Sequence, residues 1–401
     1  MTDGGGATGA APPPHPRPGR PSPVRRTRIA RGPDGRRTAP GEAAAMKSSR
    51  LTRLGWIAVV ACVPYLALKL LWVLGLDVGV VDASRFSRTT WIAANAATFL
   101  LDAVAAVVAH TLTRPAGRRA PAWLLALPLW AAAGLLLPLL TGLLGGSLTG
   151  LVTGARNPLA DGDFLQPWVF GVVYGGFLVE AVTLLGAFAV YAHQRWGALL
   201  RRPLGALPRT GSRALQRLFL LPAAAVLAAL GTVRVLWGAG AGPGTPTAGG
   251  PPRTVLSAAS DCAQGGYAVA GAVGLVLLVL PGLLPRLRVR TPLALAWAGS
   301  ATVFACGGCT WLVQAVAGGL FGAGAVPGGL PGLLGALELC TGLVVLCAGA
   351  FALCELAVAA GPAPAASERG VPAPPAPGTR EDPLSSASLR AVRECASTDD
   401  R

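Results

Sequence analysis

The sequence predicts an all-α membrane protein with eight transmembrane helices and both termini in the cytoplasm. Mean hydropathy is +0.55, and 52% of the 401 residues are hydrophobic whereas only 13% are charged. The apolar residues fall in eight runs of about 20 residues or more, the length that a helix needs to cross a hydrocarbon core of about 30 Å. Each run is expected to be helical, because a segment in lipid must satisfy its own backbone hydrogen bonds.

The loops between these runs alternate in charge. Three loops hold twelve arginines and no acidic residue, whereas the loops between them hold four arginines and five aspartates. The positive-inside rule places the arginine-rich loops and the basic N-terminal segment in the cytoplasm, and an even number of spans returns the C-terminus there. The expected spans are 54–76, 91–112, 121–144, 167–192, 218–238, 263–284, 293–317 and 333–360.

The net charge of +16 is explained by this topology, so no nucleic-acid partner is expected. The expected partners are the lipid bilayer and an unknown membrane protein. Residues 1–53 form a basic tail and residues 361–401 a second polar tail, and both are expected to be disordered because they have few large apolar side chains. Met46, directly before the first span, is an alternative start to Met1.

Short matches along the chain indicate two parallel four-helix halves, 54–197 and 217–360, joined by a basic cytoplasmic linker, 198–216. Internal repeats of this kind are common in transporters, where sites lie between the halves. Chance similarity is the alternative, because Ala, Leu and Gly dominate the spans and Asp102 has no charged counterpart in the sixth span. The matches are Lys69 and Trp72 with Arg234 and Trp237, and Glu180 and Thr183 with Glu338 and Thr341.

Ionisable residues within the spans are candidate functional residues, because each costs about 2.5 to 3.5 kcal/mol on insertion scales. At 1.5 Å per residue, Lys69, Arg234 and Glu338 lie roughly 8 Å below the outer surface. Asp102 and Glu180 lie nearer the middle. Depth therefore predicts that Arg234 pairs with Glu338, and that Lys69 pairs with Asp102 or Glu180.

Two threonines extend this candidate site. Thr183 and Thr341 each follow a glutamate by three residues and share its helix face, so each carboxylate is expected to recruit a hydroxyl. The complete candidate set is Lys69, Asp102, Glu180, Thr183, Arg234, Glu338 and Thr341.

Two functions fit this set. In the first, the protein is a non-enzymatic scaffold or accessory protein whose charge pairs hold helices together; basic residues beside interfacial tryptophans, as at Lys69 and Arg234, favour it. In the alternative, it transports a small solute or cation along a polar path lined by Asp102, Glu180 and Glu338. No nucleophile and base cluster and no phosphate-binding loop is recognisable, so no enzyme, cofactor or metal site is expected.

The cysteines are interpreted as packing residues. Cys306-Gly-Gly-Cys309 has the spacing of a redox or metal pair, but no second pair or nearby histidine accompanies it. Val59-Val60-Ala61-Cys62 has the form of a lipoprotein cleavage site, but the apolar run continues well past Cys62. An uncleaved first helix is therefore expected.

Around Pro64-Tyr65-Leu-Ala-Leu-Lys69-Leu-Leu-Trp72-Val-Leu-Gly75, the sequence resembles a group of uncharacterised multi-pass membrane proteins of high-GC actinobacteria. The resemblance covers mainly the first span and the general layout, and it implies no activity. The 32 arginines against two lysines also fit a GC-rich coding bias. The implied location is the bacterial cell membrane.

Overall fold

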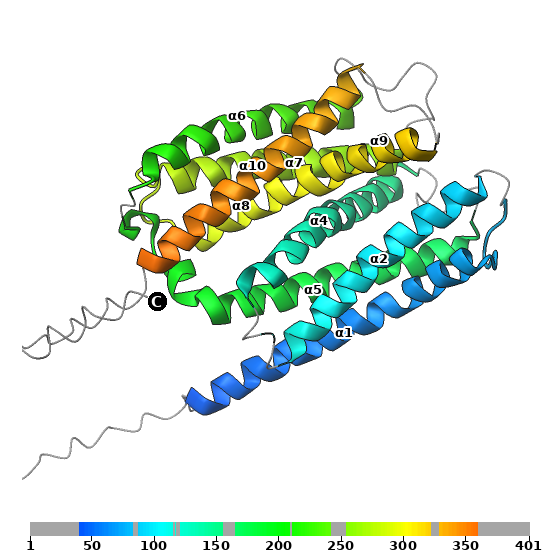
Figure 1. Ribbon diagram of the computed structural model, residues 1–401, viewed down its shortest axis with the longest axis horizontal. Helices are drawn as coiled ribbons and strands as arrows, with labels where there is room; N and C mark the ends of the chain where they lie inside the picture. Colours follow the sequence, from blue (N-terminus) through cyan, green and yellow to red (C-terminus); the bar gives the residue numbers. More distant parts are fainter. Residues whose placement is uncertain are drawn as a thin grey trace, which may run out of the picture. The chain divides into compact units, whose positions relative to one another are not determined.

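The computed structural model describes residues 40–82, 87–114, 117, 121–154, 165–208, 211–241, 254–321 and 329–359 (Figure 1). The chain divides into two compact units, Met1–Ser49 and Arg50–Arg401. In the first unit the described residues are 40–49, the beginning of helix α1. The tail at 361–401 lies outside the described residues.

Eight helical segments of the described chain are long and apolar enough to cross a membrane, which confirms the prediction of a multi-pass helical membrane protein. Seven are single helices, and the seventh segment in the chain is built from three consecutive pieces. The helices are α1 (Pro40–Leu74), α2 (Arg88–Thr113), α4 (Ala122–Thr153), α5 (Pro167–Arg201), α6 (Arg213–Gly238), α7 (Val255–Val279), α8 (Arg290–Thr302) with η3 (Val303–Cys309) and α9 (Thr310–Phe321), and α10 (Gly329–Ala359).

Several helices extend beyond the apolar runs. Residues 40–53, expected to be disordered, begin α1, and the linker 198–216 contains the end of α5, the 3-10 turn η2 (Leu204–Ala206) and the start of α6. Helix α7 begins eight residues before the expected span, at Val255. There the Thr254 and Ser257 side chains accept hydrogen bonds from each other's backbone N–H, which satisfies two free donors at the helix start. This earlier start brings Asp261 into the helix.

The seventh span contains a π-helix, η3, between α8 and α9. Such segments are rare and are frequent at functional sites. Here the π-helix presents Gly307 and Gly308 to α10, where a Cβ on Gly307 would overlap the Glu338 carboxylate and one on Gly308 would meet the backbone of Leu339 at 2.5 Å. Because Gly307 and Gly308 have no side chains, η3 and α10 can approach each other closely.

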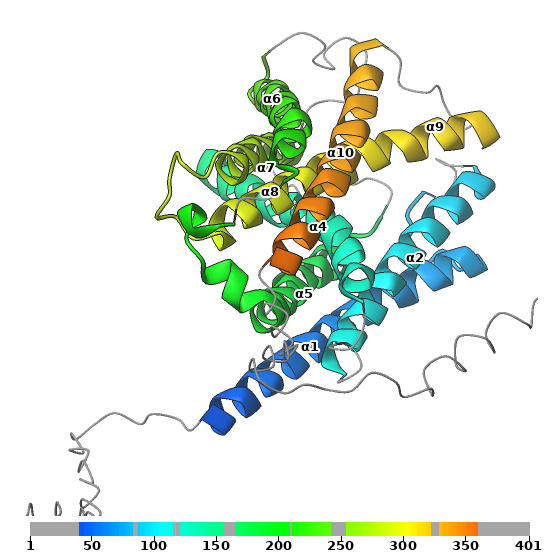
Figure 2. The same ribbon diagram turned by 60° about the vertical axis from the view of Figure 1, so that its left-hand side comes forward.

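The buried residues form separate cores. One core is built from α1, α2, α4 and α5, around Leu129 and Leu184. Another is built from α6, α7, α8, η3 and α10, around Leu227. Helix α4 also packs on α7, α8 and η3, so it joins the two groups of helices, as both views show (Figures 1 and 2). The division into two duplicated halves stays a prediction.

Loops pair at both ends of the bundle. At one end, Val80 bridges Leu165, and Gln166 N–H donates to the Gly79 carbonyl at 2.8 Å. At the other end, Pro203 bridges Arg288, with further backbone bonds of 2.8 and 2.9 Å flanking the bridge. Each pair joins two loops that the charge pattern assigns to one side of the membrane.

Candidate functional site

Arg234 and Glu338 form an ion pair, as predicted from depth, in which Glu338 is buried and Arg234 is partly buried. Arg234 Nε donates to Glu338 Oε1 at 2.9 Å and Nη2 donates to Oε2 at 2.8 Å, so a planar guanidinium meets a planar carboxylate through two parallel bonds. Asp261 Oδ1 lies 3.6 Å from Arg234 Nη1, and the Trp237 ring centroid lies 5.6 Å from Cζ. Arg234 lies on α6, Asp261 on α7 and Glu338 on α10, so the three charged residues link three helices.

The pairing expected for Lys69 was wrong. Lys69 Nζ donates to the Asn95 Oδ1 at 2.8 Å, and it lies 5.0 Å from the ring centroids of both Tyr65 and Trp72. Asn95 is fixed in turn, because its Nδ2 donates to the Trp91 carbonyl at 2.8 Å. Lys69 therefore reaches a neutral amide and two aromatic rings of α1 and α2, rather than Asp102 or Glu180.

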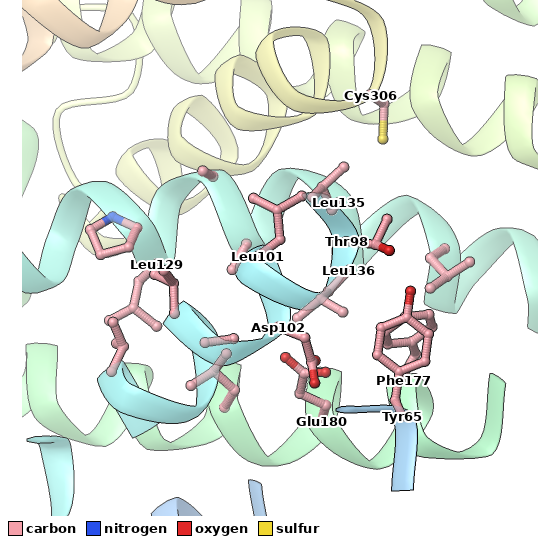
Figure 3. A pocket seen from close by; sticks show the side chains of 18 of the residues that line it. Tyr65, Thr98, Leu101, Asp102, Leu129, Leu135, Leu136, Phe177, Glu180 and Cys306 are labelled. Atoms are coloured by element: carbon pink, nitrogen blue, oxygen red, sulfur yellow. The ribbon is translucent and has the colours of Figure 1, made fainter. Parts of the chain in front are cut away.

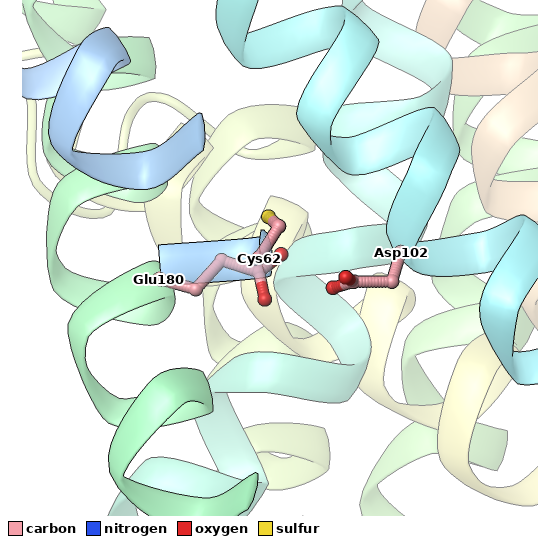
Figure 4. Close-up of side chains that lie close together, drawn as sticks. All are labelled: Cys62, Asp102 and Glu180. Carbon is pink, nitrogen blue, oxygen red and sulfur yellow. The ribbon is translucent and has the colours of Figure 1, made fainter. Parts of the chain in front are cut away.

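Asp102 and Glu180 instead face each other, together with Cys62. One donor atom of each side chain lies within 4.8 Å of the other two (Figure 4). All three residues are buried, with exposed fractions of 5%, 4% and 1%. Asp102 Oδ2 is buried and has no hydrogen-bond partner among the described residues, and neither carboxyl takes part in a salt bridge there. Two acidic groups thus lie together without a basic counter-charge.

Of the two threonines expected to bind a carboxylate, Thr183 instead bonds to the backbone of its own helix. Thr183 is buried, but its hydroxyl donates to the Val179 carbonyl at 2.6 Å, one turn back along its own helix. Its hydrogen is therefore used by the backbone and not by the Glu180 carboxylate. Thr341 is also buried, one turn from Glu338 on α10.

A cavity of about 480 Å³ opens on the two carboxyl groups. Its walls are mostly apolar side chains of α2, α4 and α5, and Figure 3 shows the Asp102 and Glu180 carboxyls close together beside them. The cavity also reaches the second group of helices, because Cys306 of η3 lines it. The thiol of Cys306 donates to the Gly134 carbonyl of α4 at 3.2 Å. The remaining polar lining residues are Tyr65, Thr98 and Ser260.

Three members of this arrangement were missed by sequence reasoning: Cys62, Asn95 and Asp261. The hydropathy pattern leaves Asp261 in a loop, because the apolar run begins after the helix start at Thr254. Cys62 carried a usable signal, since it precedes Lys69 by seven residues and so lies on the same face of α1. Asn95 carries no charge, so the cost of burying ionisable groups does not mark it as a candidate.

No protein-family model matches the chain, and neither the curated proteins nor the solved structures contain a match. The resemblance to actinobacterial membrane proteins therefore stays a prediction.

Proposed function

We propose that this integral membrane protein transports a small cation or a proton, with Asp102 and Glu180 as the binding residues. The observation that carries the proposal is the opposed pair of buried carboxyls beside a cavity, without a basic partner among the described residues. Ionisable residues inside a membrane are rare, and those without a counter-charge commonly mark ion or proton pathways.

Electrostatics explains why such a pair takes up positive charge. Two carboxylates that lie within 4.8 Å of each other repel each other by at least about 3.5 kcal/mol at an effective dielectric constant of about 20. The repulsion disappears when the pair shares a proton or binds a cation. Apolar walls around the cavity strengthen this preference, because they offer few polar groups to solvate the charges.

Glu338, which the sequence placed on the polar path, is not part of the path proposed here. Its carboxylate is bound through both oxygens by Arg234, so it acts as a clamp between α6 and α10. Lys69 and Asn95 make the corresponding connection between α1 and α2. These contacts hold each group of helices in register, while α4 joins the groups beside the cavity.

A second candidate function is the scaffold or accessory protein, which the Arg234–Glu338 clamp favours. In that case Asp102 and Glu180 share a proton permanently and bind no ion. For either function, the charge of the loops supports an orientation with both termini in the cytoplasm, and the excess of arginine over lysine supports a location in a bacterial cell membrane.

Charge-selective labelling of a cysteine in the cavity distinguishes the two functions. Thr98→Cys, in a background without other cysteines, is treated with small membrane-impermeant thiol reagents that carry either a positive or a negative charge. The cation path predicts labelling, with the cationic reagent reacting faster because the carboxyls attract it. The preference should fall when Glu180→Gln is added.

Thr341→Cys is the matched control, since it is buried on α10 and does not line the cavity. It should remain unlabelled. Protection of Thr98→Cys from both reagents, while Arg201→Cys in the basic linker reacts, would contradict a water-accessible path and support the scaffold.

A further inference from the structure

We propose that Cys62, Asp102 and Glu180 bind a divalent metal ion of the zinc class. The inference rests on the proposed cation path and names the ion that its site accepts. It uses a residue that neither proposed function needs: the buried thiol of Cys62, which α1 places against the two carboxyls.

The three donors have the spacing of an incomplete metal site. Helices α1, α2 and α5 each supply one, and the donor atoms lie within 4.8 Å of one another (Figure 4). Zn–S bonds of about 2.3 Å and Zn–O bonds of about 2.0 to 2.2 Å place tetrahedral donors about 3.5 Å apart. Side-chain movements of about 1 Å therefore bring the three groups into contact with one ion.

A buried oxygen without a partner points independently to a ligand. Asp102 Oδ2 makes no hydrogen bond within the described part of the chain, although the residue is only 5% exposed. Burying such an atom unpaired costs free energy, and a metal–oxygen bond would remove that cost. Figure 4 shows the Asp102 carboxyl directed toward Glu180 and Cys62.

The thiol selects the class of ion. Carboxylates alone suit Mg²⁺ or Ca²⁺, which prefer six or more oxygen ligands, whereas a thiolate favours softer ions such as Zn²⁺. Binding exchanges the ion for the protons on the donors, and two positive charges then offset most of the three negative ones. Three protein ligands leave a fourth position open, which a water molecule from the cavity can fill.

Metal binding to the full-length chain tests the proposal. The purified protein in detergent micelles is stripped of metal and titrated with Zn²⁺, and bound zinc is counted per chain by elemental mass spectrometry. One tightly bound ion is expected. Cys62→Ala and Glu180→Gln should each weaken binding by at least about 100-fold, since loss of outer-shell partners alone costs 10- to 100-fold. Cys306→Ser, which changes a cavity thiol outside the three-residue group, is the matched control and should bind as the unaltered chain does.

X-ray absorption of the zinc-loaded, unaltered protein gives a second readout that needs no variant. The site predicts one sulfur ligand at about 2.3 Å with oxygen ligands at about 2.0 to 2.2 Å. A zinc shell without sulfur, or affinity unchanged in Cys62→Ala, overturns the metal site.

The two proposals fail separately. Charge-selective labelling of Thr98→Cys without zinc binding overturns the metal site and leaves the cation path. Zinc bound through Cys62, combined with protection of Thr98→Cys, supports the metal site as a structural one and removes the path.

Discussion

Removing one member of the Arg234–Glu338 pair should destabilise the protein strongly, and removing both should restore part of the loss. Breaking a buried pair from one side costs about 3 to 5 kcal/mol, because the remaining charge stays buried without compensation. Arg234→Leu should reach this range, since it leaves Glu338 2% exposed in an apolar setting with a second carboxylate, Asp261, on the neighbouring helix.

Glu338→Leu should cost less than Arg234→Leu. Arg234 keeps Asp261 within 3.6 Å, and 20% of its side chain is exposed. The double variant removes both charges, so its loss should be smaller than the sum of the single losses by about 2 kcal/mol, within the range for residues that share an ion pair. The free energy of unfolding is measured by denaturation with SDS in mixed micelles.

Arg217→Leu is the control, because Arg217 lies on the same helix and is exposed. It should change the free energy of unfolding by less than about 0.5 kcal/mol. The reasoning is refuted if Arg234→Leu behaves like this control, or if the losses of the two single variants simply add in the double variant.

Two further changes test the contacts around the π-helix and α4. Gly307→Ala should lower the midpoint of thermal unfolding well below that of Gly349→Ala, because the added methyl group overlaps the Glu338 carboxylate whereas nothing lies within 4 Å at Gly349; equal midpoints would contradict the close approach. Trp130→Phe removes the 3.1 Å bond from the indole Nε1 to Ser300 Oγ, and it should cost about 1 kcal/mol in the same SDS titration unless this link between α4 and α8 contributes nothing.

The transmembrane layout could be predicted because length and hydropathy determine a span without knowledge of its neighbours. Depth in the membrane was also enough to predict the Arg234–Glu338 ion pair, because the two residues have opposite charges and were placed at the same depth. It failed for Lys69, because depth does not specify how a helix is rotated about its axis, and Asn95 rather than Asp102 faces the ammonium.

The meeting of Cys62 with Asp102 and Glu180 depends on contacts between three helices. Hydropathy and charge along the chain do not show which helices meet, and a thiol among apolar residues gives no charge signal. The π-helix is equally hidden, since Val303–Cys309 continues the apolar pattern of its span and only the close approach of α10 distinguishes it.

The central claim is that Asp102 and Glu180 carry a small cation across the membrane. Uptake of H⁺, Na⁺ and Zn²⁺ into vesicles containing the purified protein tests it most directly, with an inward gradient of each ion and Glu180→Gln as the matched variant. The account predicts uptake of at least one ion well above that of protein-free vesicles, and its loss in Glu180→Gln. Uptake of all three ions that is the same for the unaltered protein and for Glu180→Gln would contradict it.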